Sequence, residues 1–110
     1  MENNSIDNYS EFWDFYVTEH SKPLTRYLHF FGTALGLVML AWFLWSGSYF
    51  LIPLCFVVGY GFSWASHFFV EKNRPASFKY PLWSFASDYK MMFYMVTGKM
   101  NSEVERLING

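Results

Sequence analysis

Two long apolar segments joined by a short turn dominate the pattern of this chain. No Asp, Glu, Lys or Arg occurs between Arg26 and Glu71, a stretch of 44 residues. The pattern predicts one helix over 23–45 and a second over 49–70, each about 33 Å long at ~1.5 Å per residue, which is enough to cross a membrane. Because the Ser-Gly-Ser turn at 46–48 is so short, we expect the two transmembrane helices to be antiparallel neighbours.

A shorter helix is predicted before this hairpin. Aromatic residues recur at helical spacing over 7–20, with acidic residues between them, which is typical of an amphipathic helix. Such a helix lies on the membrane surface or packs against the rest of the protein. The first twenty residues carry five acids and no Lys or Arg, so we expect a retained helix rather than a signal peptide.

The chain after the hairpin predicts a cytoplasmic loop, a third helix and a tail. Residues 71–81 are polar and contain two prolines. Residues 82–98 predict an apolar helix that ends at a glycine, and its two charged residues leave open whether it spans the membrane or lies at the interface. Residues 99–110 predict a polar tail with one short helix at 102–108.

Composition supports a single membrane domain over 1–110 and an all-α integral membrane protein. Hydrophobic residues make up 53% of the chain, aromatic residues 24% and charged residues 15%, which excludes a disordered chain. The net charge of −1 argues against a nucleic-acid partner. The single cysteine excludes an intrachain disulfide and a thiolate zinc cluster. Two spans would bury little surface alone, so a homo-oligomer is one expectation.

The charges around the hairpin predict its orientation. The turn between the two helices carries no charge, whereas the opposite flanks carry five basic residues: Lys22, Arg26, Lys72, Arg74 and Lys79. By the positive-inside rule these flanks face the cytoplasm. In a bacterial cell the protein would lie in the inner (plasma) membrane.

The three histidines of the chain are candidates for a metal site. An antiparallel hairpin brings His29 and His67 to the same membrane face, and the break after residue 20 allows His20 to fold back toward them. Glu71 is four residues after His67, on the same side of a helix. Imidazole with carboxylate suits Fe²⁺, and also zinc or manganese. The alternative is that these are structural, hydrogen-bonded histidines.

Other polar residues near this face are weaker candidates. Lys72, Asn73 and Arg74 are predicted to bind a carboxylate or phosphate head group, or else to anchor the chain at the interface. Asp88 is predicted to hold a histidine N–H, to pair with Arg74 or Lys90, or to lie in water on a flat helix.

Two stretches also carry a resemblance to a known family. Residues 15–33 read FYVTEHSKPLTRYLHFFGT and residues 59–76 read GYGFSWASHFFVEKNRPA, with a third block in YPLWS at 80–84, Asp88 and TGK at 97–99. These motifs resemble a family of small multi-pass membrane proteins, formerly a domain of unknown function, with the activity of an iron(II)-dependent 2-hydroxy fatty acid dioxygenase. The chain departs from the family pattern at Ser66 and Ala34, and its short length is similar to the bacterial branch.

The resemblance implies fatty acid α-oxidation, in which a 2-hydroxy fatty acid and O₂ give a fatty acid one carbon shorter. It implies His20, His29 and His67 as iron ligands, and Glu71 as a further ligand or a residue that supports them. Glu71 and Asp88 are the candidate catalytic residues, and Lys72 or Arg74 would neutralise the substrate carboxylate. One alternative is a non-catalytic membrane protein that binds lipid or a partner protein. Another is a subunit of a small transporter.

Overall fold

The computed structural model describes residues 6–109, which are helical and contain no strand. The five α-helices are α1 (Tyr9–Thr18), α2 (Pro23–Ser46), α3 (Ile52–Ala65), α4 (Pro81–Thr97) and α5 (Lys99–Val104). Short 3₁₀-helices occupy Tyr49–Leu51 and Ala76–Phe78, and π-helices occupy Ser66–Glu71 and Glu105–Asn109. The all-α class predicted from the sequence is therefore confirmed.

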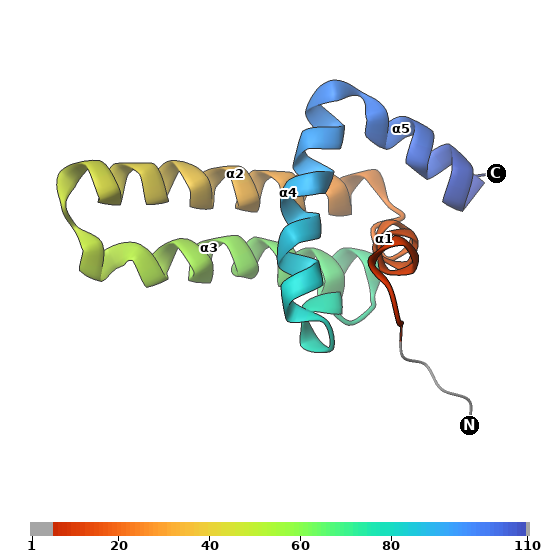
Figure 1. Cartoon of the computed structure of the whole chain (residues 1–110), viewed down its shortest axis with the longest axis horizontal. Helices are drawn as coiled ribbons and strands as arrows, with labels where there is room; N and C mark the ends of the chain where they lie inside the picture. The colour runs from red at the N-terminus through yellow and green to blue at the C-terminus, as the bar shows by residue number, and fades with distance from the viewer. Residues whose placement is uncertain (1–5, 110) are drawn as a thin grey trace.

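The apolar hairpin is the longest feature of the molecule (Figure 1). Its two arms, Pro23–Ser46 with 24 residues and Tyr49–Glu71 with 23, are long and apolar enough to cross a membrane. Only 17% of the most apolar stretch of each arm is buried within the protein. The outer faces expose large apolar side chains, among them Phe31, Val38, Trp42, Trp45, Phe50 and Val57. Contiguous apolar surface of this kind marks an interaction with lipid or protein.

Glycines allow the two arms to lie close together. A Cβ atom on Gly32 would lie 2.6 Å from Cβ of Phe62, and one on Gly36 would lie 3.1 Å from the carbonyl oxygen of Cys55. Small residues spaced four apart permit this close approach of helix backbones in membranes. Gly47 ends α2 with a φ of 74°, a left-handed conformation that glycine adopts without strain.

The remaining helices gather at one end of the hairpin. Figure 1 shows α4 crossing the hairpin while α1 and α5 lie beyond it, so the end with the turn projects alone. Mostly aromatic and methionine side chains, together with Val17, form the core between α1, α4 and α5: Phe12, Trp13, Tyr16, Val17, Met91 and Met100. The third apolar helix therefore lies across the hairpin and does not run alongside it as a further long span.

The C-terminal tail is more helical than its polar composition predicted. Helix continues from Lys99 through Asn109. Gly98 separates it from α4 with a φ of 84°, and Met100 is buried in the core with Val104 and Leu107 packed against it. Because these apolar residues recur at helical spacing, one face of the tail is held by packing on α1.

Candidate metal centre

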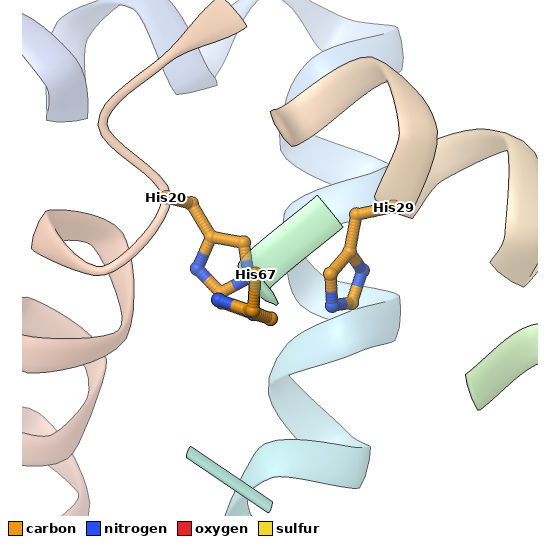
Figure 2. Close-up of side chains that lie close together, drawn as sticks. All are labelled: His20, His29 and His67. Carbon is orange, nitrogen blue, oxygen red and sulfur yellow. The ribbon is translucent and has the colours of Figure 1, made fainter. Parts of the chain in front are cut away.

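The structure brings the three histidines together in a buried cluster. His20 follows α1, His29 belongs to α2, and His67 belongs to the π-helix at the end of the second arm. Figure 2 shows their rings drawn close together from these three segments. The ring centroid of His20 lies 4.7 Å from that of His29 and 4.5 Å from that of His67. One nitrogen of each ring lies within 4.8 Å of the other two, and all three histidines are buried.

The hydrogen bond that His20 makes to the backbone leaves its other ring nitrogen free. Its Nδ1 lies 2.6 Å from the carbonyl oxygen of Tyr16, so Nδ1 carries the proton that it donates and Nε2 carries the lone pair. The Nε2 atom is buried without a hydrogen-bond partner. Burial, followed by the neighbouring His29 and His67 rings, lowers the pKa of His20 well below its ordinary value. The ring is therefore neutral, as a metal ligand must be.

Asn73 fixes His67 in the same way. The Nδ1 of His67 lies 2.8 Å from Oδ1 of Asn73, while the Asn73 amide donates through Nδ2 to the backbone oxygen of Glu19 at 3.2 Å. That second bond identifies Oδ1 as the acceptor, so the lone pair of His67 lies on Nε2. Lys72 has a φ of 66° and turns the chain back after the π-helix, which brings Asn73 to the ring.

His29 lies between a hydroxyl group and a carboxylate. Its Nε2 is 2.6 Å from Oγ of Ser63 and 3.4 Å from Oδ1 of Asp88, while its Nδ1 is buried without a partner. The hydroxyl of Tyr16 donates to the same carboxylate at 2.6 Å. Burial raises the pKa of Asp88 to about 7, against the opposing effect of the Tyr16 hydrogen bond. Asp88 is therefore part of this site and does not lie in water.

The structure places Glu71 at the start of α2, where three hydrogen bonds hold its carboxylate. Its carboxylate accepts hydrogen bonds from Oγ of Ser21 at 2.7 Å, the backbone N–H of Lys22 at 2.5 Å and Oγ1 of Thr25 at 2.8 Å. The chain between His67 and Glu71 is a π-helix with i→i+5 bonds, so the α-helical relationship of residues four apart does not hold there. Glu71 joins the second arm to the start of α2.

The other predicted residues divide between the surface and the site. Lys72 and Arg74 are exposed, whereas Asn73 is hydrogen-bonded to His67. Lys90 does not pair with Asp88: its Nζ lies 4.2 Å from the ring centroid of Trp13.

Two further residues orient the cluster and were not among the residues predicted from the sequence: Tyr16 and Ser63. Tyr16 lies four positions before His20, on the same side of a helix, and that spacing was the available signal for it. Ser63 contacts His29, which is 34 residues away in the sequence, so no local spacing indicates that contact. Tyr16 also stacks on the His20 ring, with centroids 4.2 Å apart.

The residues present fit a divalent transition-metal ion. Two buried ring nitrogens, Nε2 of His20 and Nδ1 of His29, have no hydrogen-bond partner, and an unsatisfied buried polar atom costs about 1–3 kcal/mol. Three neutral imidazoles are ligands that iron, zinc, copper and nickel accept. An ion bound within the cluster would satisfy Nε2 of His20. The chemistry of the donor set alone does not select among these metals.

Comparison with known protein families shows which family the chain belongs to. A family model described as 2-hydroxy-palmitic acid dioxygenase Mpo1-like matches residues 6–100. No curated protein and no solved structure matches the chain significantly. The matched region includes all three histidines, the π-helix and α4. Because the match covers most of its length, the chain belongs to the Mpo1-like family of 2-hydroxy-palmitic acid dioxygenases.

Proposed function

We propose that this protein is an iron(II)-dependent membrane dioxygenase that shortens 2-hydroxy fatty acids by one carbon. The reaction balances when a 2-hydroxy acid and O₂ give the shorter acid, carbon dioxide and water. The observation that carries the proposal is the buried cluster of three histidines inside a chain of the dioxygenase family. His20, His29 and His67 would hold the ion.

Iron is proposed rather than zinc because the reaction reduces O₂, and zinc has no redox chemistry. When bound, iron(II) would supply electrons to O₂ and coordinate the hydroxyl and carboxylate oxygens of the substrate. The protein's contribution is to hold three neutral rings in a dry pocket. Tyr16 and Asn73 do this through the Nδ1 atoms of His20 and His67.

Asp88 is proposed to bind the substrate next to the cluster. Its carboxylate lies 3.4 Å from the His29 ring and lines the same cavity, where it is placed to accept a hydrogen bond from the 2-hydroxyl group. The Tyr16 hydroxyl keeps it in this position. Lys72 and Arg74, exposed at the end of the second arm, are proposed to attract the anionic head group. Glu71 is proposed as a positioning residue.

We further propose that the hairpin is inserted in a membrane with the histidine cluster near its cytoplasmic surface. The uncharged turn lies at one end of the hairpin and the basic residues at the other, which agrees with the positive-inside rule. Helix α4 crosses the hairpin and would lie along the interface. Its exposed apolar residues recur at helical spacing along one face: Leu82, Phe85, Phe93 and Val96.

Metal content and oxygen consumption test the proposed function. Wild-type protein is reconstituted with iron(II) without oxygen and compared with a variant in which His20, His29 and His67 are all alanine. We expect about one iron per wild-type chain, none above background in the variant, and oxygen uptake with 2-hydroxypalmitic acid but not with palmitic acid. A folded wild-type protein that binds no metal and consumes no oxygen would favour the non-catalytic, lipid-binding alternative.

A further inference from the structure

A groove runs along the hairpin between the arms and α4. Its walls are formed mainly by Thr33, Leu37 and Leu40 of α2, Phe56 of α3, and Phe85 and Tyr89 of α4. The enclosed part of the space measures about 50 Å³, and the groove together with its open side measures about 470 Å³. The groove is therefore shallow, and an occupant would keep one side exposed to the surroundings.

The groove adjoins the cavity of the histidine cluster. Tyr60, Ser63 and Asp88 line both spaces. Ser63 contacts the His29 ring through its Oγ atom at 2.6 Å, so the groove begins beside a predicted metal ligand. A ligand that lies in the groove therefore has one end at the cluster.

The character of the groove changes along its length. The end at the cluster carries hydroxyl and carboxyl groups, whereas Leu37, Leu40 and Phe56 make the far end apolar. His29 and Leu40 are eleven residues apart in α2, which corresponds to about 16 Å at ~1.5 Å per residue. A polar end followed by an apolar groove of this length suits one unbranched acyl chain lying along the hairpin.

Two glycines contribute no side chain to the groove and so leave its space unfilled. Gly36 and Gly59 line the groove without side chains that would fill it, and the close approach at Gly36 makes backbone and Cys55 part of its floor. The groove is partly open, and most of its lining residues belong to the two arms that are long enough to cross a membrane. With these arms in a membrane, a lipid chain would enter the groove from the side.

We propose that this groove holds the acyl chain of the substrate and that Leu37 and Leu40 limit the chain length that fits. The inference rests on the proposed function, since it assigns the part of the substrate that the histidine cluster does not contact. The head of the acid lies at the cluster, and the methyl end lies toward Leu40.

Photochemical crosslinking tests the location of the chain without requiring catalysis. Metal-free protein in lipid nanodiscs is irradiated with 2-hydroxy fatty acids that carry a diazirine at successive positions, and the adducts are mapped by mass spectrometry. We expect adducts to move from Thr33 through Leu37 to Leu40 as the diazirine moves toward the methyl end. Adducts spread over the outer face at Val38 and Trp42, whatever the diazirine position, would overturn the groove.

A pair of substitutions tests chain-length selection. Leu37→Trp fills the middle of the groove, whereas Val38→Trp places the same bulk on the outer face, where Val38 is 65% exposed. We expect Leu37→Trp to lower kcat/KM for long-chain 2-hydroxy acids about tenfold relative to short-chain ones, and Val38→Trp to leave that ratio within about twofold. An unchanged ratio in an active Leu37→Trp protein would overturn the assignment.

The two tests separate this inference from the proposed function. If the protein binds no iron but the adducts still follow the groove, the groove is an acyl-chain site and the dioxygenase proposal fails. If the wild-type protein is active but the adducts do not follow the groove, the dioxygenase proposal stands and the groove does not hold the chain.

Discussion

His67 and Asn73 are six residues apart in the sequence, and their side chains meet at 2.8 Å between Nδ1 and Oδ1. The contact exists because the π-helix ends at Lys72, whose φ of 66° reverses the chain. Asn73 also donates to the backbone of Glu19, just before His20. One amide side chain thus orients one histidine ring and holds the segment that carries another.

We predict that Asn73→Leu weakens metal binding without abolishing it. The substitution leaves the His67 Nδ1–H without its acceptor, and loss of such a partner costs about 10–100-fold in metal affinity. Competition with a metal-sensitive dye measures the change. Asn73→Asp keeps an oxygen acceptor, so its metal affinity should be closer to that of the wild type. Wild-type affinity in Asn73→Leu would show that Asn73 does not support the site.

We predict that Glu71→Gln lowers stability but keeps the metal. A neutral amide has one oxygen acceptor where the carboxylate has two, so part of the contact with Ser21, Lys22 and Thr25 is lost, at about 1–3 kcal/mol. Thermal unfolding in detergent measures the stability, and elemental analysis measures the metal in the folded fraction. A folded Glu71→Gln protein without metal would instead identify Glu71 as a ligand.

We predict that Gly32→Ala destabilises the hairpin by about 1–3 kcal/mol, the usual range for overpacking. The added Cβ would lie 2.6 Å from Cβ of Phe62 and 3.0 Å from the backbone oxygen of Gly59. Gly61→Ala is the matched control, because a Cβ atom there meets nothing within 4 Å. Denaturant unfolding should separate the two variants. Equal stability would mean that the arms do not pack as closely as the structure shows.

We predict that metal removal lowers the unfolding temperature of the wild type. A ligand that binds only the folded state stabilises it by RT ln(1 + [L]/Kd), about 2.7 kcal/mol at 100 times Kd. Scanning calorimetry with and without a chelator measures the effect. The variant with alanine at His20, His29 and His67 should not respond to the chelator. An equal response in both proteins would place the stabilising ion elsewhere.

The linear sequence predicted the elements that depend on local composition. The uncharged stretch between Arg26 and Glu71 predicts two apolar helices by itself, because charged side chains are costly in a membrane and each segment is long enough to cross one. The turn at Gly47 makes the arms antiparallel, which brings His29 and His67 to the same end. The family motifs were also readable, and the match over residues 6–100 confirms that membership.

Tertiary structure alone decided how the polar groups are shared around the cluster. Spacing suggested that Glu71 shares a helix side with His67, and residue type suggested that Asn73 binds a head group or anchors the chain. In the structure, the π-helix and the left-handed Lys72 direct Glu71 to the start of α2 and Asn73 to His67. Periodicity assumes an ideal α-helix and therefore misses a local change of helical type.

The groove is likewise a product of tertiary packing. It requires the backbone approach at Gly36 and the crossing of α4 over the hairpin, which place Phe85 and Tyr89 opposite Leu37. Composition and spacing determine which segments are helical and which faces are apolar. The angle at which α4 crosses depends on how side chains of separate helices interlock, and no local pattern in the chain encodes that contact.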